Sequence, residues 1–490
     1  MVELSASPVR RSARYGVRAS TLLVLILAGF LLGPIMAVFA AALGDSEGLW
    51  AHLASTLLPV YVANTVTLMA GTGAVSLAFG VGAAWLVSRY DFPGRRIMEW
   101  ALLLPAAVPA YIVAYTYTDL LEYAGPVQGA LRALFGWTST RDYWFPEIRS
   151  MGGAMLVMGS ALYPYVYMMT RIAFRQTPLS LNDVARIHNR SLFLSVALPM
   201  ARPAMAAGLA LVLMETVSDF GTVEYFALET LTLGIFNVWL GMNSLPAAAQ
   251  IASVATLFVV TLLALELTAR SRRRYAGGSR RATGLAVETL GGWRALSCLA
   301  LCLIPVVMGF ALPAAILLSF VLQGYSLDDY GTVLLVAENS VLLAALTAGL
   351  IALIATVMVL TVTFRGNRPL RFLAGLSAIG YAFPGTILAI GVLTFSGALD
   401  DGLEFLTVDL LGMEDGIYLT GSLALVVIAC VVRFHAVGFG ALTAGSAACR
   451  PTCCMPAACS AAVFPRVCAR LPCRSSAVRS WRRRCWPLST

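Results

Sequence analysis

Lysine is absent from this chain of 490 residues, and all 34 basic residues are arginine. A phosphate-binding loop of the GxxxxGK[ST] type requires a lysine, so the chain is not itself a P-loop ATPase. Charge is also scarce, because charged residues make up 12% of the chain, whereas soluble domains carry about 25%. The net charge of +9 does not indicate nucleic-acid binding, since most arginines lie in short segments between apolar runs.

Histidine is nearly absent as well. The three histidines, His52, His188 and His435, are too far apart in the sequence to suggest a metal cluster. Zinc sites of known types bring several His or Cys ligands together at short, fixed spacings. We therefore expect no metal site, and a surface or interfacial position for each histidine.

What the chain has in abundance is apolar sequence of membrane-spanning length. Hydrophobic residues make up 59% of the chain, and the mean hydropathy is +0.81. An apolar run of about 20 residues crosses the hydrocarbon core of a bilayer as a helix. Such runs lie near 20–43, 62–87, 98–120, 151–170, 204–222, 248–268, 294–322, 338–363, 372–396 and 417–434. The sequence thus predicts an all-α polytopic membrane protein with ten spans in contact with the lipid bilayer.

The arginines predict how these spans are oriented. Four arginines precede the first run, which is too long for a signal peptide, so we expect a retained first helix. Arginine-rich and arginine-free connections then alternate along the chain, except at 121–150, where arginine and acidic residues are mixed. Because arginine marks cytoplasmic loops, this alternation places the N-terminus in the cytoplasm.

Residues 51–130 recur weakly 275 positions later. Asn64 returns as Asn339, Arg96 as Arg371, and Pro109 as Pro384. Both copies enter the membrane in the same direction, which predicts two parallel repeats of about six spans, the second incomplete. Transporters often build their pathway between two such repeats. The expected parts are a basic N-terminus (1–19), a first half (20–268), an arginine-rich cytoplasmic linker (269–293), a truncated second half (294–448) and a tail (449–490).

The tail differs in composition from everything before it. It holds seven of the ten cysteines and eight arginines, without one acidic residue. A cysteine-rich metal or disulfide module is one interpretation, but the tail contains no CxxC pair and no histidine. Translation of a GC-rich gene in the wrong frame would give the same bias toward Arg, Ala, Pro, Ser and Cys. We favour this second interpretation.

The segment after the fourth span has the signals of a short docking helix. Ser180 with Asp183 forms a capping box, which predicts a helix start on the cytoplasmic side. An amphipathic helix there could dock into a groove of a soluble partner. An ordinary interfacial helix remains the alternative on these features alone.

This segment resembles the EAA loop of ABC importer permeases, whose pattern is E-A-A, three residues, Gly, nine residues, then I-x-L-P. Asp183, Val184 and Ala185 stand for E-A-A, Asn189 stands for the glycine, and Leu198-Pro199 stands for L-P. Asn tolerates the left-handed backbone that the glycine position needs better than most residues do. Pro199 follows Asn189 by ten positions, where the family pattern has thirteen.

The sequence METVSDFGTVEYF, with the later GIFNVW and AAAQ, resembles more narrowly the fused ferric-iron permeases. This resemblance covers roughly residues 20–448. The resemblance implies two six-span halves in the inner membrane of a bacterium, two copies of a separate ATPase subunit, and a periplasmic substrate-binding protein. It also implies that the chain has no catalytic residues and no cofactor, because ATP hydrolysis belongs to the ATPase.

Two acidic residues in the fifth span are candidates for the translocation pathway. Glu215 and Asp219 are four positions apart and would share one helical face. Ionisable groups inside a membrane are costly and usually face a pathway or a partner, and carboxylate oxygens suit a hard cation such as Fe(III). The alternative is that both lie near the outer end of the span, solvated or paired.

The sequence therefore predicts the membrane permease of an ATP-binding-cassette importer for ferric iron. A permease for thiamine or another small solute is the nearest alternative. An ion-driven secondary transporter, or a non-functional product of a frameshifted permease gene, are the others.

Overall fold

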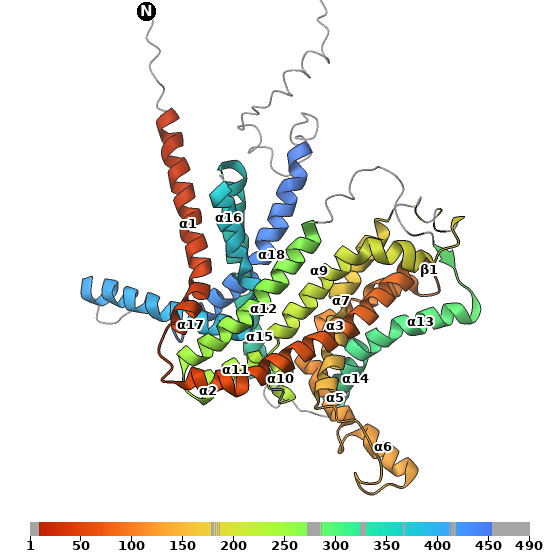
Figure 1. The fold of residues 1–490 in the computed structure, drawn as a ribbon. Coiled ribbons are helices and arrows are strands. Elements are labelled where there is room, and N and C mark those ends of the chain that lie inside the picture. The colour runs from red at the N-terminus through yellow and green to blue at the C-terminus, as the bar shows by residue number, and fades with distance from the viewer. Residues whose placement is uncertain are drawn as a thin grey trace, which may run out of the picture. The chain divides into compact units, whose positions relative to one another are not determined.

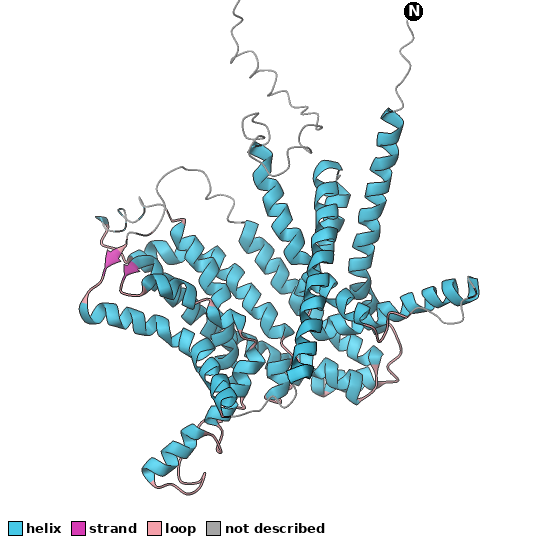
Figure 2. Cartoon of the chain, turned by 180° about the vertical axis from the view of Figure 1, so that it is seen from behind, coloured by secondary structure: helices cyan, strands magenta, loops and turns pink. Residues whose placement is uncertain are grey.

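The computed structural model describes residues 9–177, 181, 183, 185, 187–271, 285, 287–323, 330–365, 368–410, 412 and 418–452. These residues are predominantly helical (Figure 2). The only strands among them are β1 (Tyr90–Asp91) and β2 (Glu288–Thr289), which pair in parallel. The prediction of an all-α polytopic membrane protein is confirmed.

The helices follow the chain as labelled in Figure 1. The first part contains α1 (Val9–Ala42), α2 (Leu49–Ser55), α3 (Leu57–Arg89), α4 (Arg95–Ala101), a 3-10 helix (Leu104–Ala107), α5 (Ala110–Leu121), α6 (Pro126–Phe135) and α7 (Met151–Arg175). A π-helical turn (Phe193–Ala197), α9 (Leu198–Ser218), α10 (Gly221–Tyr225), α11 (Leu231–Phe236), a second π-helical turn (Asn237–Gly241) and α12 (Leu245–Ser271) follow. The last part contains α13 (Gly292–Val306), a π-helical turn (Val307–Ala311), α14 (Leu312–Leu322), α15 (Tyr330–Arg365), α16 (Arg368–Leu376), a 3-10 helix (Ser377–Ala382), α17 (Gly385–Glu404), a π-helical turn (Phe405–Leu410) and α18 (Leu423–Thr452).

Seven helices of the described residues are long and apolar enough to cross a membrane, or up to eight if a bent pair counts as one span. The sequence predicted ten. The bent pair replaces the expected span 98–120, because Arg95–Ala107 and Ala110–Phe135 meet at 91°. The expected spans 151–170 and 248–268 are present as helices α7 and α12. Among the residues whose side chains are described, α12 contributes the apolar stretch Leu245–Thr261.

Contacts divide the chain into two compact units. The larger comprises Leu31–Ala344 and Ile379–Arg433, and the smaller comprises Met1–Phe30, Ala345–Ala378 and Phe434–Thr490. In the smaller unit, α18 packs on α15 where Gly438 lies against Ile351 and Ala355. The predicted out-of-frame tail lies outside the described residues from 453 onward.

Close packing of α3, α7 and α9 forms the centre of the larger unit (Figure 1). Two glycines allow the helices to approach. A Cβ at Gly80 would lie 2.7 Å from the Val166 Cβ, and one at Gly208 would lie 2.8 Å from the Val166 Cα. Small residues at such crossings are how helices associate in membranes, where apolar burial gives little preference for protein over lipid. Tyr163 and Tyr167 on α7 are fully buried in the core that results.

Two further contacts join segments far apart in the sequence. The Tyr117 hydroxyl on α5 donates to the Met308 carbonyl, 3.0 Å away, just after α13. Gly391 on α17 lies against the backbone of Pro34 on α1, where a Cβ would find no room. All four residues belong to the larger unit.

The order of elements recurs at the offset that the sequence suggested. Helix α16 contains Arg371 as α4 contains Arg96, and each helix leads into a 3-10 helix. Pro109 then precedes α5 with φ/ψ of −57°/139°, and Pro384 precedes α17 with −52°/144°. This correspondence supports the repeat, while the exact division of the chain into halves stays a prediction.

Candidate functional site

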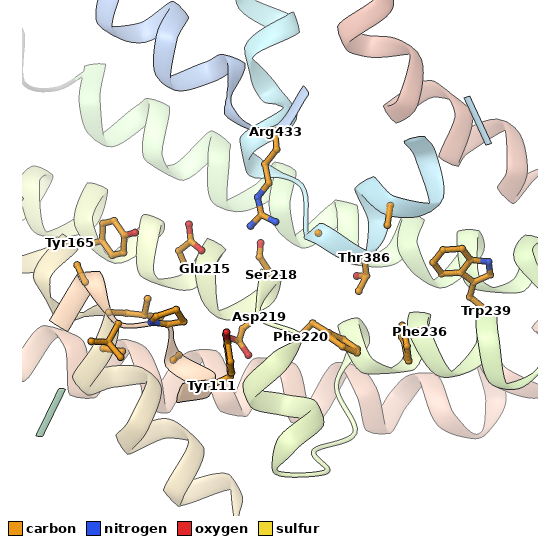
Figure 3. Close-up of a pocket in the computed structure, with 18 residues that line it drawn as sticks. Tyr111, Tyr165, Glu215, Ser218, Asp219, Phe220, Phe236, Trp239, Thr386 and Arg433 are labelled. Atoms are coloured by element: carbon orange, nitrogen blue, oxygen red, sulfur yellow. The ribbon is translucent and has the colours of Figure 1, made fainter. Parts of the chain in front are cut away.

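A cavity of about 590 Å³ lies in the larger unit (Figure 3). Its walls come from the 3-10 helix Leu104–Ala107, α5, α7, α9, α11 with the π-helical turn after it, α17 and α18, and from the connections beside these helices. Most of the lining is apolar or aromatic. The charged and hydroxyl-bearing residues that line it are Tyr111, Tyr165, Glu215, Ser218, Asp219, Thr386 and Arg433. A largely apolar cavity with a few convergent polar groups is typical of a small-ligand site.

Glu215 contributes a half-buried carboxylate near the end of α9. The Tyr381 hydroxyl donates a hydrogen bond of 2.6 Å to its Oε1 atom. Tyr381 lies in the 3-10 helix before α17, so this bond connects α9 to the segment that leads into α17. A phenol donating to a carboxylate is one of the stronger hydrogen bonds in proteins, because the acceptor carries a charge.

Asp219 also reaches the cavity wall, but its carboxylate has a local role. Helix α9 ends at Ser218, and Asp219 is extended, with a ψ of 123°. Asp219 Oδ1 accepts from the Thr222 amide at 2.8 Å, and Oδ2 accepts from the Thr222 hydroxyl at 3.1 Å. It therefore caps α10 as an N-terminal carboxylate does. Asp219 thus lies at the C-terminal boundary of α9, four positions after Glu215, and both residues line the same cavity.

Arg433 is a site residue that the sequence analysis missed. It points into the cavity from α18 (Figure 3). Arg433 is the one acidic or basic residue within the apolar helix Leu423–Gly445, apart from His435. A single arginine within a spanning helix is costly unless it faces a polar site. This rarity of charge in the apolar run could have identified Arg433 from the sequence.

The bend of the chain at Pro109 positions part of the cavity wall. Pro109 precedes α5 in an extended conformation, and Ala106, Val108, Pro109, Ala110 and Tyr111 all line the cavity. Proline lacks an amide hydrogen and disfavours helix in the preceding residue, so the chain turns there instead of continuing α4. The bend thus brings the connection before α5 and the first residues of α5 to the cavity. In a straight helix the backbone would be covered by its own side chains.

The expected coupling segment is helical where it is described. Asp183 is exposed and Ala185 is buried, and both have helical backbone. Val184 and the expected capping residue Ser180 lie outside the described residues. Asn189 adopts a left-handed φ of 47°, and the Arg190 amide donates to the Ala185 carbonyl at 3.0 Å. This six-to-one bond after a left-handed residue is the Schellman pattern that ends a helix. Asparagine therefore takes the backbone geometry expected of the family's glycine.

Leu198 and Pro199 lie at the start of the next long helix. A π-helical turn, Phe193–Ala197, precedes them, and Pro199 occupies the first turn of α9. The helix is continuous from Phe193 to Ser218, with helical backbone at Ala197. The π-helical turn is an irregularity of the kind that occurs where proline, which lacks the amide hydrogen, interrupts the hydrogen bonds of a helix. The structure thus places Asp183, Ala185 and Asn189 in the segment between α7 and α9, and Leu198 and Pro199 in the first turn of α9. Glu215 and Asp219 lie at the opposite end of α9, by the cavity.

The cavity offers hard oxygen donors to a solute. The Glu215 carboxylate and the Tyr165 and Tyr111 phenols line it together with the Ser218 hydroxyl. Among the described residues, no group of three or more His, Cys, Asp or Glu could hold a metal ion.

A model of the family described as "binding-protein-dependent transport system inner membrane component" matches residues 76–274. The sulfate transport system permease protein CysT of Salmonella typhimurium is 30% identical over 231 residues, which are 44% of this chain and 80% of the relative. The molybdenum transport system permease protein ModB of Escherichia coli is 28% identical over 213 residues, 41% of this chain and 89% of the relative.

A third relative matches a longer part of the chain. The Fe(3+)-transport system permease protein FbpB 2 of Haemophilus influenzae is 22% identical over 342 residues, which are 68% of this chain. This chain spans 63% of that relative. The matches place the polytopic chain among transport permeases of the inner membrane. This chain belongs to the family of inner membrane components of binding-protein-dependent transport systems.

Proposed function

We propose that the chain is the membrane permease of an ATP-binding-cassette importer that takes up ferric iron. The observation that carries the proposal is the length of the match with permeases of that name. Two ferric permeases of Haemophilus influenzae align with 68% and 89% of this chain, at 22% and 21% identity. The sulfate and molybdenum permeases align with 44% and 41%.

In this function a periplasmic binding protein delivers the ion, and two copies of an ATPase subunit bind from the cytoplasm. The N-terminus lies in the cytoplasm. Asp183, Val184, Ala185 and Asn189 form the segment that the ATPase contacts, with Leu198-Pro199 as the start of the helix that receives the motion. Closure of the ATPase pair favours one of two permease conformations, since a partner shifts an equilibrium only by binding one state more tightly.

Glu215 is the group that faces the solute in this function. Its carboxylate is a hard oxygen donor of the kind Fe(III) prefers, and Tyr381 holds it in position through the 2.6 Å hydrogen bond. Asp219 shapes the wall of the pathway by fixing the turn after α9. No covalent chemistry is required of the permease.

A direct test is uptake of radioactive Fe(III) by cells or proteoliposomes that contain the chain, its ATPase and its binding protein. Uptake should require ATP and should fall at least tenfold in Glu215→Gln. Tyr381→Phe should lower uptake severalfold, because it removes the donor that positions the carboxylate. Uptake of Fe(III) by Glu215→Gln at the wild-type rate would remove Glu215 from the pathway. Uptake in vesicles that lack ATP would indicate a secondary transporter instead.

Import of an oxyanion is the second candidate, and Arg433 favours it. An arginine in the cavity could pair with sulfate or molybdate through two parallel hydrogen bonds. The sulfate and molybdenum relatives carry such solutes in their names. Competition of radioactive sulfate, molybdate, thiamine and Fe(III) in the same uptake assay distinguishes these solutes, and Arg433→Gln should abolish uptake only of an anion. A chain that supports no uptake of any of them transports another small solute or is the non-functional product of a frameshifted permease gene.

A further inference from the structure

One carboxylate in the larger unit contacts three arginines. Glu99, on α4, accepts from Arg171 and from Arg175 on α7, the latter through Nη2 at 3.1 Å from both of its oxygens. Arg95, on α4 itself, places its Nε 3.6 Å from Glu99 Oε1. The Tyr167 hydroxyl on α7 also donates to the Glu99 backbone carbonyl at 3.2 Å. Helix α7 therefore holds Glu99 both by its side chain and by its backbone.

These charges are partly withdrawn from water. The side chains of Glu99 and Arg171 are 17% and 18% exposed, while that of Arg175 is 54% exposed. Pairs on a protein surface contribute little, because water and salt screen them. Breaking a desolvated pair costs much more, because it leaves a buried charge without its partner. Loss of the carboxylate would leave Arg171 without the acidic partner that it contacts, whereas Arg95 would keep Asp91, whose Oδ1 lies 3.6 Å from its Nη1.

The arginine side of this cluster lies next to the coupling segment. Arg175 is the last residue of α7, and Asp183, the first residue of the EAA-like pattern, follows eight positions later. Phe174, the residue before Arg175, is fully buried and packs on the ring of Trp85. A displacement of the coupling segment therefore acts on a helix end that is fixed to its neighbours.

The glutamate side of the cluster leads to the cavity. Five residues after Glu99, the chain enters the 3-10 helix Leu104–Ala107, and Ala106 and Val108–Tyr111 line the cavity. No long flexible loop intervenes, because α4, the 3-10 helix and α5 follow one another within a few residues. Glu99 is thus the point at which the end of α7 is connected to the bent segment that borders the cavity.

The second repeat lacks this carboxylate. The position 275 residues after Glu99 is Ala374, although Arg96 recurs as Arg371 in the same helix. Alanine offers no charge to a neighbouring helix. The connection through a carboxylate therefore exists in the first repeat alone.

We propose that Glu99 is a positioning residue through which movement of the coupling segment is transmitted, by way of α7 and α4, to the cavity border at Ala106–Tyr111. The proposal rests on the proposed function, since it assumes that an ATPase moves the coupling segment. It also makes the two repeats unequal, with the first transmitting the motion through an ionic contact that the second does not have.

The first experiment needs no partner and no solute. The full chain in lipid nanodiscs is compared with Glu99→Gln by hydrogen–deuterium exchange of the peptide 104–112. Glu99→Gln should raise exchange in that peptide severalfold, whereas Glu99→Asp, which keeps the carboxylate, should stay close to wild type. Glu288→Gln is the matched control, because it removes a carboxylate from the nearby 2.8 Å pair with Arg89, outside the proposed connection. Equal exchange in Glu99→Gln and wild type would overturn the proposal.

The second experiment separates transmission from simple stability. In the assembled transporter, ATP hydrolysis and solute uptake are measured together for the same variants. Glu99→Gln should keep the ATPase bound and its turnover within about twofold, while uptake per ATP falls about tenfold. A residue that only stabilises the fold would lower both activities in proportion, and that outcome would also refute the proposal.

A double variant guards against misfolding. Glu99→Gln with Arg171→Gln removes one charge of each sign, so it does not leave the Arg171 charge without its acidic partner as the single variant does. It should fold and still show the low uptake per ATP; normal uptake per ATP in this variant would overturn the proposal. If the wild-type chain binds no ATPase, the proposed function fails, and the exchange experiment still decides on Glu99.

Discussion

Replacing Asp219 by asparagine and by alanine separates the two roles that its carboxylate can have. The carboxylate accepts two hydrogen bonds from Thr222, at 2.8 and 3.1 Å, and so fixes the turn between α9 and α10. Asparagine keeps an oxygen that can accept from the Thr222 amide but has no charge. Alanine removes both the acceptor and the charge.

The expected magnitudes follow from these contacts. Truncating a capping side chain to alanine costs about 1 kcal/mol, within a range of roughly 0.5–2 kcal/mol. Because the Thr222 hydroxyl loses its acceptor as well, Asp219→Ala should lower the free energy of unfolding by about 1–2 kcal/mol. That loss corresponds to a roughly 5–30-fold change in the unfolding equilibrium. Asp219→Asn should cost about 0.5 kcal/mol or less, since asparagine caps about as well as aspartate.

The assay is denaturant unfolding of the purified chain in detergent, followed by tryptophan fluorescence, with uptake measured in parallel. Asp219→Asn should retain at least half of the wild-type uptake, because the turn is preserved. Equal destabilisation by asparagine and alanine would refute the capping argument. Full stability with no uptake in Asp219→Asn would show that the charge itself acts in the pathway.

Three other predictions concern packing, backbone and charge. Gly208→Val should lower the free energy of unfolding by about 1–3 kcal/mol, because its side chain has no room beside Val166. Gly82→Val on α3, where a Cβ meets nothing within 4 Å, is the matched control for valine inside a helix. Asn189→Gly should leave ATPase binding unchanged, whereas Asn189→Val should weaken it, since a β-branched residue resists the φ of 47°. Hydrogen bonds from the Ser139 and Thr138 amides lower the pKa of Asp142. Its contribution to the 138–142 turn should therefore be fully present above the ordinary aspartate pKa and be lost as the pH falls through the lowered pKa of the folded protein. Asp142→Asn should make amide exchange in this turn independent of pH once intrinsic rates are corrected for.

The sequence predicted the helices well because long apolar runs in a membrane have few alternatives to helix. It could not predict where those helices break. The run 98–120 reads as one span by composition, yet Pro109 redirects the chain by 91° between its two parts. Helix α9 likewise ends at Ser218, where the carboxylate of one residue, Asp219, accepts a hydrogen bond from the Thr222 amide and starts a new turn.

The candidate site was predicted in part for a related reason. Glu215 and Asp219 stand out because acidic residues are rare in apolar runs. Arg433 carries an equally strong signal, but it lies at the end of the expected span 417–434, where an arginine looks like an ordinary flanking residue. Only the path of α18, which continues to Thr452, places it next to the cavity. Tyr381 could not have been identified at all, because its contact with Glu215 joins residues 166 positions apart.

The two long-range contacts at Tyr117 and Gly391 have a consequence for how the protein can be built. With the chain divided at the linker, α1 of the first half packs on α17 of the second, and the segment after α13 of the second half bonds to α5 of the first. The opening segment of each half therefore contacts the other half, as an exchanged element does in a domain-swapped dimer. A gene split within 272–284 should yield two polypeptides that assemble when made together. Either fragment made alone would lack both the close approach of Gly391 to Pro34 and the hydrogen bond between Tyr117 and Met308, and we expect it to be degraded.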